Sequence, residues 1–276
     1  MSNAIGRTRS LTDPLDAARA AALLATLDRP GAMPVAGDPL PPFWHYIYFW
    51  EALPPDALGR DGHPKTGGFI PDTGLPRRMW AGGSLEFLNP VRLGDPAIRT
   101  STISDLARKQ GKTGALAVIR IDHEIQQDGQ TCIRERQDLI YREDPDLSAL
   151  KSSPKPSPKP APTDETHATK MRFSSTLLFR YSALTFNGHR IHYDRDYCRE
   201  VEGYPGLVVH GPLLAQLLIH LAVEALGGLS RFDFRAITPL FDFEEAELCV
   251  RKDGDLVKLW VRGPDGRLCM TAEATA

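Results

Sequence analysis

The segment at residues 212–226 is apolar on nearly every side, and it constrains the fold more than any other stretch of this chain. Its apolar residues include Leu213, Leu214, Leu217, Leu218, Ile219, Leu221, Ala222, Val223 and Leu226. The segment is shorter than the ~20 residues that span a bilayer, and a surface helix would keep a polar stripe. Gly227 and Gly228 supply the stop expected after a helix. The pattern predicts a buried helix enclosed by a curled antiparallel sheet.

Strand patterns occupy much of the rest of the chain. Strands are expected at residues 84–91, 97–106, 115–126 and 130–141. Asp128-Gly129 separates the last two, and such a two-residue turn between β-rich runs predicts an antiparallel hairpin. A helix is expected at residues 13–27, with Asp13 as its N-cap and Pro14 at its first position.

The composition changes abruptly at residues 148–162, which repeat Ser-Pro and Lys-Pro. Proline lacks an N–H group and restricts the residue before it, so this stretch cannot form a helix or an inner strand. We expect a stiff, extended, solvated linker; a ligand for a proline-binding module is the alternative. The linker, taken as residues 148–165, would separate a domain at residues 1–147 from a second at residues 166–276.

The two halves share a pattern that indicates an internal repeat. Leu85-Glu-Phe87 and Phe232-Asp-Phe234 each open a strand that is followed by a proline and a charged turn. The segments Asp128-Gly-Gln-Thr-Cys132 and Asp265-Gly-Arg-Leu-Cys269 then close a hairpin in each half. We therefore expect the two halves to fold alike.

Residues 179–211 bring an amide, imidazoles and carboxylates close together in the sequence. These groups belong to Asn187, His189, His192, His210, Asp194 and Asp196. The apolar helix follows at once, and a helix N-terminus offers free N–H groups and a positive dipole. Groups that move protons next to such a terminus predict a catalytic site.

The spacing of this stretch resembles the signature of the MaoC-like (R-specific) enoyl-thioester hydratases. The matching residues are Tyr181, Leu184, Thr185, Asn187, Ile191, His192 and Asp194, followed by His210 and Gly211. The form Asn-Gly-His-Arg-Ile-His-Tyr-Asp is most similar to the branch with hydroxyacyl-thioester dehydratase type 2 and the mesaconyl-CoA and itaconyl-CoA hydratases. Asn187 stands where the family usually has a catalytic Asp, and His189 and Arg190 stand where it has Asn and Pro.

This resemblance implies an α+β double hot-dog fold, in which two antiparallel sheets each wrap a central helix and join side by side. Residues 166–276 would be the catalytic half. Residues 1–147 would be a half without catalysis, because they hold no counterpart of the motif from Asn187 to His192. The implied enzyme is a hydro-lyase that adds or removes water across the 2,3-bond of an enoyl or 3-hydroxyacyl thioester, without a cofactor. Its acyl group would be short or branched, for example mesaconyl.

The resemblance also implies roles for individual residues. His192 would be the general acid/base, Asn187 would orient water, and the Gly211 N–H would stabilise the enolate oxygen. Substrate binding would involve Tyr181, His189, Arg190, Asp194 and His210. His210 could instead shape the turn.

Other assignments stay open for these side chains. Structural roles are expected for His45, His63, His123, His167 and His220. A metal cluster of His189, His192 and Asp194 lacks an evident fourth ligand, so no metal is expected. Cys198 could be a nucleophile beside a histidine, although a buried thiol is favoured. Asp194 and Asp196 could simply cap a turn.

Coenzyme A or a carrier-protein phosphopantetheine is expected in the crevice between the halves. Candidates for its phosphates are Arg77, Arg78, Arg180 and Arg190. The loop at residues 56–76 and the aromatic run at residues 44–50 could define the acyl pocket. A buried strand or the rim of a binding cleft would each suit the aromatic run, and plain core packing is favoured.

A net charge of −2 argues against a nucleic-acid or membrane-surface partner. The polar N-terminus does not resemble a secretory leader. It favours a cytoplasmic enzyme, as do four scattered cysteines without a Cys-x-x-Cys motif: Cys132, Cys198, Cys249 and Cys269. Fatty-acid metabolism is what the family resemblance implies. Either a monomer or a homodimer fits. Two other functions stay open: a hot-dog thioesterase, for which Glu224 is the only carboxylate on the central helix, and a non-catalytic thioester-binding or scaffold subunit.

Overall fold

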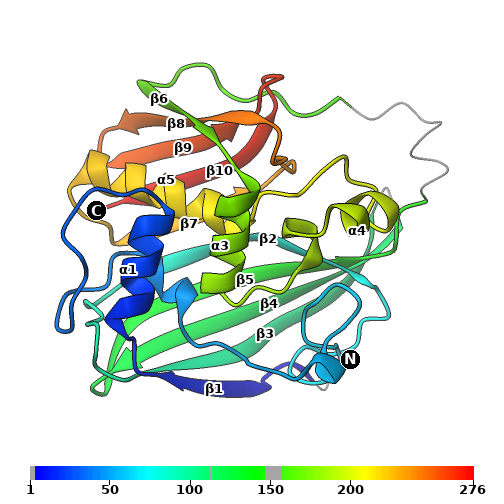
Figure 1. The fold of residues 1–276 in the computed structure, drawn as a ribbon, viewed down its shortest axis with the longest axis horizontal. Helices are drawn as coiled ribbons and strands as arrows, with labels where there is room; N and C mark the ends of the chain where they lie inside the picture. Colours follow the sequence, from blue (N-terminus) through cyan, green and yellow to red (C-terminus); the bar gives the residue numbers. More distant parts are fainter. Residues whose placement is uncertain (1–3, 112–113, 147–156) are drawn as a thin grey trace.

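Ten strands form one antiparallel sheet in the computed structural model (Figure 1), which describes residues 4–111, 114–146 and 157–276. The strands are β1 (Thr8–Asp13), β2 (Arg77–Phe87), β3 (Ala97–Gly111), β4 (Gly114–Gln127), β5 (Gln130–Arg142), β6 (His167–Arg172), β7 (Arg231–Ala236), β8 (Glu245–Asp253), β9 (Leu256–Arg262) and β10 (Leu268–Thr275). The helices are α1 (Ala17–Thr26), α3 (Ser175–Leu184), α4 (Arg195–Glu200) and α5 (Gly211–Leu226), with 3-10 turns η2 (Trp44–Ile47), η3 (Pro55–Ala57) and η4 (Arg190–His192).

The order of the strands repeats from the centre of the sheet outwards. It runs β1-β3-β4-β5-β2-β7-β10-β9-β8-β6, so each half places its second strand at the junction and its first strand at the outer edge. The junction is the pairing of β2 with β7. Cys132 and Cys269 lie buried at the start of equivalent strands, β5 and β10. The predicted internal repeat is confirmed by this topology.

Helix α5 lies against the C-terminal half of the sheet, where it contacts β8, β9 and β10 (Figure 1). Leu213, Leu218 and Ile219 have no exposed surface, and full burial of such a side chain contributes roughly 1.5–3 kcal/mol. Gly227 ends the helix with a φ of 78°, a conformation that glycine adopts without strain. The prediction of a buried helix at residues 212–226 is confirmed.

The N-terminal half holds no helix of comparable length among its described residues. Its α1 packs against α3 instead of lying across the sheet. The stretch between α1 and β2 contains only the short turns η2 and η3. The concave side of the N-terminal half is therefore covered by irregular chain, which leaves room for a cavity.

The first helix begins later than predicted. Asp13 is not its N-cap, because Asp13 ends β1 and its carboxylate accepts hydrogen bonds from the backbone N–H groups of Leu15 and Phe49. Leu15 has a φ of 51°, which interrupts any helix that starts at Pro14. The cap is Asp16, whose side chain accepts from the N–H of Arg19.

Two irregular segments also differ from prediction. Residues 44–50 are not a strand, because η2 coils their first part; most of their aromatic side chains are buried. Half of the predicted linker, residues 148–156, lies outside the described residues. Its described end is mostly exposed, and it is anchored to the C-terminal half because Pro160 bridges to Arg267 and the Ala161 N–H bonds to Gly266 O at 2.9 Å.

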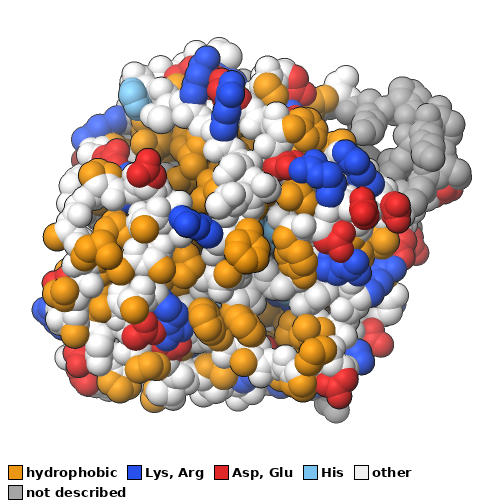
Figure 2. Space-filling view, in the orientation of Figure 1, with side chains coloured by type: hydrophobic (Ala, Val, Ile, Leu, Met, Phe, Trp, Pro, Cys, Tyr) orange, Lys and Arg blue, Asp and Glu red, His pale blue; other side chains and the backbone are white. Residues whose placement is uncertain are grey.

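None of the helices in the described part of the chain is long and apolar enough to cross a membrane. On the face shown in Figure 2, basic and acidic side chains are interspersed rather than gathered by sign.

Candidate active site

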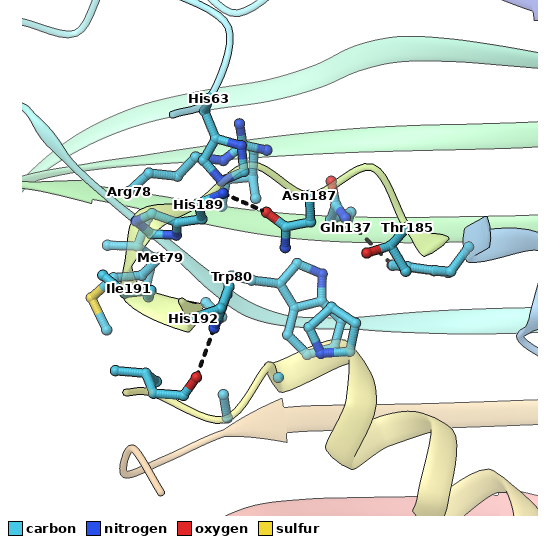
Figure 3. Close-up of a pocket in the computed structure, with 18 of the residues that line it drawn as sticks. His63, Arg78, Met79, Trp80, Gln137, Thr185, Asn187, His189, Ile191 and His192 are labelled. Atoms are coloured by element: carbon cyan, nitrogen blue, oxygen red, sulfur yellow. Dashed lines mark hydrogen bonds between the residues drawn. The ribbon is translucent and has the colours of Figure 1, made fainter. Parts of the chain in front are cut away.

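A cavity of about 620 Å³ lies between the two halves and is lined by residues of both. The C-terminal half contributes α3, the turn after it, η4 and the start of α5, and the N-terminal half contributes β2, β4, β5 and the loop before β2. Figure 3 shows Asn187 and His192 at this cavity, with Arg78 and Trp80 from β2. Of the residues predicted to form the site, Tyr181, Asn187, His189, His192 and Gly211 line the cavity.

The turn that carries Asn187 and His189 is held in place by a close crossing of two backbones. A Cβ atom on Gly62 would lie 1.9 Å from Gly188 O, and one on Gly188 would lie 2.6 Å from Gly62 O. Gly62 also has a φ of 86°. The Arg190 N–H donates to Asp61 O at 2.9 Å beside this crossing. Glycine at both positions thus lets the loop before β2 dock on the turn that carries Asn187 and His189.

His192 is buried on η4 and has a defined tautomer. Its Nδ1 lies 2.7 Å from Val208 O, and because a carbonyl oxygen only accepts, Nδ1 carries the proton. Burial lowers the pKa of His192 to about 4, although the hydrogen bond to Val208 acts in the opposite direction. The neutral ring therefore presents an unprotonated Nε2, which has no partner among the described residues, at the cavity.

Asn187 has its amide orientation fixed by a local hydrogen bond. Its Oδ1 accepts from the backbone N–H of His189 at 3.0 Å, so its NH₂ group is the end that is free to donate. The amide lies at the cavity wall (Figure 3). Asn187 can therefore hold a water molecule by donating to its oxygen, but it cannot accept a proton.

Gly211 is the first residue of α5, where backbone N–H groups have no partner within the helix. A Cβ atom at this position would lie 2.6 Å from Cε3 of Trp80. Glycine thus allows the Trp80 ring to pack directly on the helix start. This packing closes one wall of the cavity around the Gly211 N–H.

His210 does not line the cavity but supports His192 from behind. Its Nε2 lies 2.8 Å from the hydroxyl of Ser182, and its ring stacks on that of His192. Burial, followed by the neighbouring His192, holds the pKa of His210 well below its usual range. The structure thus favours the alternative in which His210 shapes the turn over a direct contact with substrate.

Tyr181 is 1 % exposed, and its hydroxyl has no hydrogen-bond partner in the described structure. Burial raises the pKa of this phenol, so it keeps its proton. Its ring meets His210 edge-on at 5.1 Å. Since Tyr181 also lines the cavity, its O–H is a donor available to a bound substrate.

His189 and His63 form a pair of rings at the cavity wall, with centroids 4.8 Å apart. His189 also meets His192 edge-on at 5.6 Å. Burial is the main cause that holds the pKa of both His63 and His189 well below the usual range. The sequence predicts a structural role for His63 and contains no signal for its position here, because the crossing of Gly62 with Gly188 brings it to the cavity.

Arg190 and Asp194 do not line the cavity, so their predicted contact with substrate is not supported. Asp194 caps α4 by accepting from the Tyr197 N–H at 2.9 Å. That bond, and the ion pair with Arg190 at 2.6 Å, lower the pKa of the Asp194 carboxyl. In Figure 2, basic and acidic side chains lie together over α4. The capping role that was the alternative for Asp194 is the one observed.

Several polar residues of the N-terminal half also line the cavity, which the sequence did not indicate. They are Arg99, His123, Glu135 and Gln137. Burial raises the pKa of Glu135, but hydrogen bonds from His45 and Tyr46 outweigh it and leave the pKa at about 2. The cavity wall therefore carries a buried, ionised carboxylate.

The remaining candidates are a thiol nucleophile, two arginines for phosphate binding and a metal cluster. Cys198 is buried, and burial raises the pKa of its thiol to about 12, so it is no nucleophile at neutral pH. Arg77 pairs with Glu202 at 2.6 Å, and Arg180 lies exposed on α3 away from the cavity. Within the described residues, no group of three or more His, Cys, Asp or Glu side chains is arranged to hold a metal ion.

Both segments of the N-terminal half that were named for the acyl pocket contribute residues to the cavity lining. From the aromatic run, the lining residues are Tyr46, Tyr48, Phe49 and Trp50, and from the loop at residues 56–76 they are His63, Pro64, Lys65, Gly68, Phe69 and Ile70. Tyr48 and Phe49 also belong to the hydrophobic core, as do Trp44 and Ile47, which do not line the cavity.

Comparison with known proteins places this site in a family. Residues 43–242 match the model of the family "Hydroxyacyl-thioester dehydratase type 2". A mesaconyl-C(4)-CoA hydratase of Chloroflexus aurantiacus is 44% identical over 269 residues, which cover 97% of this chain and 95% of that protein.

Solved structures agree on the fold. HtdX of Mycobacterium tuberculosis superposes with a TM-score of 0.69 at 16% identity, covering 97% of this chain and 99% of that one. A second M. tuberculosis protein, which has a double hot-dog fold, superposes with a TM-score of 0.61 at 13% identity, covering 99% and 96%. The predicted α+β double hot-dog fold is confirmed.

Proposed function

This chain belongs to the hydroxyacyl-thioester dehydratase type 2 family and is a hydro-lyase of acyl thioesters; from that premise we propose that it hydrates a short, dicarboxylic 2-enoyl-CoA of the mesaconyl-C4 type, with His192 as its acid/base. The observation that carries the assignment is the hydrogen bond from His192 Nδ1 to Val208 O. It leaves a neutral ring with a free Nε2 at the cavity, which the donor amide of Asn187 also lines.

Proton transfer follows from this tautomer. A water molecule held by the Asn187 NH₂ group donates one hydrogen to His192 Nε2, and its oxygen bonds to the β carbon. The electron pair of the double bond moves toward the thioester oxygen and forms an enolate. His192 then returns the proton from Nε2 to the α carbon, which completes the addition; the reverse steps eliminate water. Such a positioned proton carrier contributes roughly 10²–10⁴-fold.

The enolate oxygen is stabilised by the helix start in this proposal. The Gly211 N–H lies at the N-terminus of α5, where the peptide dipoles present a partial positive charge. One preorganised donor at a developing oxyanion is worth roughly 10²–10³-fold. The unpartnered hydroxyl of Tyr181 is a second donor within the same wall.

The acyl preference is supported by the polarity of the cavity wall. A long alkyl chain would have to lie against the ionised Glu135 and the nearby Arg99, and burying charges under apolar groups is costly. A short acyl group that keeps water or its own polar group in this region avoids that cost. The name of the C. aurantiacus relative, a mesaconyl-C(4)-CoA hydratase, points to the same class.

Further parts of the proposal have separate support. Coenzyme A is preferred over a carrier protein on the strength of that relative's name. The division into a catalytic half at residues 166–276 and a supporting half at residues 1–147 is supported by the location of His192, Asn187 and Gly211. A cytoplasmic location is supported by the four free, buried cysteines. Since one chain supplies both halves of the cavity, a monomer would suffice, although a homodimer also fits.

The thioesterase alternative lacks a suitable carboxylate. Glu224 lies near the far end of α5, is largely exposed and pairs with Arg29 at 2.9 Å. It does not line the cavity, so it cannot assist hydrolysis there.

A direct assay tests the proposed reaction. Purified protein is given mesaconyl-C4-CoA, crotonyl-CoA or a long-chain 2-enoyl-CoA, while enoyl-thioester absorbance and release of free thiol are followed together. We expect loss of absorbance without thiol release, fastest with mesaconyl-C4-CoA and slowest with the long chain. Thiol release would make the protein a thioesterase. Absence of both signals with all three substrates would overturn the proposed function.

A further inference from the structure

Among the cations that line the cavity, Arg78 has neither a hydrogen-bond nor an ion-pair partner in the described part of the chain. It is half-buried on β2. The other lining cations are all engaged: Arg9 pairs with Glu51, Lys65 donates to Asp56 O, and Arg99 donates to Phe49 O. A guanidinium with five donors and no acceptor in a partly buried wall is incompletely satisfied.

The carboxylates of the same wall do not neutralise Arg78, because each already has a partner. Glu51 pairs with Arg9, Glu135 bonds with His45 and Tyr46, and Glu202 pairs with Arg77. The charge of Arg78 is felt by the neighbouring imidazoles instead. After burial, it is the largest cause that lowers the pKa of His63, and it also contributes at His189.

The position of Arg78 places its charge at the reacting end of the cavity. Arg78 and Trp80 are two residues apart on β2, so they share a face of the strand and their Cα atoms are about 6.6 Å apart. Trp80 packs on Gly211, the candidate donor to the thioester oxygen. Figure 3 shows Arg78 on the same side of the cavity as His189 and His63.

We propose that Arg78 binds the free carboxylate of a dicarboxylic acyl group and thereby selects such substrates over simple 2-enoyl thioesters. This inference rests on the proposed function. In a C4 thioester of mesaconate, the free carboxylate is attached to the β carbon, the atom that water attacks. It therefore lies within one bond of the reacting centre, where an arginine can hold it with two parallel hydrogen bonds.

A phosphate of coenzyme A is the other anion that Arg78 could meet. The phosphates are separated from the thioester by the whole pantetheine arm, whereas Arg78 lies on the side of the cavity that carries His189 and His63 (Figure 3). The two ligands also predict different results, because a phosphate contact would act on every CoA thioester and on free CoA alike.

The test compares Arg78→Gln and Arg78→Lys with the wild type in three measurements. These are kcat/KM for mesaconyl-C4-CoA, kcat/KM for crotonyl-CoA, which lacks the carboxylate, and the inhibition constant of free CoA. Arg134→Gln is the matched control, since Arg134 is an exposed arginine on β5 outside the cavity, with one weak pair to Glu124 at 3.4 Å. Circular dichroism and thermal unfolding of each variant verify that it is folded.

We expect Arg78→Gln to lower kcat/KM for mesaconyl-C4-CoA by roughly 10- to 100-fold, the value of a charge-assisted hydrogen bond. Activity on crotonyl-CoA and inhibition by CoA should change by less than about 3-fold on the same basis. Arg78→Lys should lower kcat/KM for mesaconyl-C4-CoA by a smaller factor, since lysine keeps the positive charge but lacks the paired donors of the guanidinium group. An equal loss in all three measurements would assign Arg78 to a phosphate, and no loss would leave it without a ligand role; both overturn the inference. A wild type without activity on mesaconyl-C4-CoA would refute the proposed substrate itself, before any variant is made.

Discussion

The ring of His210 stacks on the ring of His192, with centroids 3.6 Å apart and planes inclined by 19°. Two imidazolium ions could not occupy this arrangement, because like charges at such a distance in a buried site repel strongly. The stack therefore keeps both rings neutral at physiological pH. It also fixes the plane of His192, so that Nδ1 points to Val208 and Nε2 points to the cavity.

Replacing His192 tests its role as the proton carrier. His192→Gln keeps a side chain of similar length that can still donate to Val208 O but cannot accept and return a proton. We expect kcat to fall by roughly 10²–10⁴-fold, with a melting temperature within a few degrees of the wild type. His167→Gln is the control, since His167 is exposed on β6. Activity of His192→Gln near the wild-type level would remove His192 from the mechanism.

The activity should show no histidine titration near neutral pH. The pKa of His192 is lowered from 6.5 to about 4 by burial, so its base form predominates above that pH. We expect kcat/KM for hydration to stay level from about pH 5 to pH 8 and to fall about tenfold per unit below the pKa. A pH–rate profile in a constant-ionic-strength buffer measures this. A fall centred at pH 6.5 would contradict the buried, neutral ring.

The same burial predicts loss of stability in acid. Folding holds His192 and His123 neutral with pKa values of about 4, whereas the unfolded chain binds protons at about 6.5. The unfolded state thus binds more protons than the folded state between these pH values. The free energy of unfolding therefore has its full value above pH 6.5 and falls as the pH drops toward 4. Each histidine contributes about 3 kcal/mol across this window. Urea unfolding at pH 7.5, 6 and 5 should show the decline; a stability that rises with acidity would contradict it.

The fold could be predicted to a large extent because its main signals are local. The apolar run at residues 212–226 identifies α5, the Asp-Gly pair after residue 127 identifies the β4–β5 hairpin, and both agree with the structure. The start of the first helix could not be predicted, since it depends on a tertiary bond from Asp13 to the Phe49 N–H. The sequence alone does not indicate whether Asp13 or Asp16 caps the helix.

The site was predictable where one segment supplies it and unpredictable where the halves meet. Asn187, His192 and Gly211 follow one another in a recognisable pattern, and all three line the cavity. Their neighbours His63 and Trp80 come from a loop and a strand more than 100 residues away. The crossing of Gly62 with Gly188 brings His63 to the cavity, and the pairing of β2 with β7 brings Trp80 there. Arg190 and Asp194 lie close to these residues in the sequence but do not line the cavity. They form an ion pair with each other instead.

Asn187 offers a test of how water is held. Asn187→Ala removes the NH₂ donor, and we expect kcat for hydration to fall by roughly 10²-fold, as for loss of one preorganised donor. Asn187→Asp keeps an acceptor for the His189 N–H but places a carboxylate near His192, which favours the imidazolium. The acid limb of its pH–rate profile should therefore move to higher pH than in the wild type. If both variants keep full activity and the acid limb of the Asn187→Asp profile stays at the wild-type pH, Asn187 takes no part in the reaction.

The crossing of Gly62 with Gly188 predicts that a distant loop controls the catalytic turn. Gly62→Ala places a methyl group only 1.9 Å from Gly188 O. The loop must therefore move away from the turn, and His63 moves with it. We expect kcat/KM for hydration to fall by at least about 10-fold, since small misplacements of catalytic groups are costly. Gly74→Ala is the matched control: Gly74 also has a positive φ, 68°, but a Cβ atom there would meet nothing within 4 Å. Both variants incur the strain of about 1 kcal/mol expected for a non-glycine residue at positive φ; thermal unfolding measures it. If Gly74→Ala loses as much activity as Gly62→Ala, backbone strain in the loop is the cause and the crossing does not position the site.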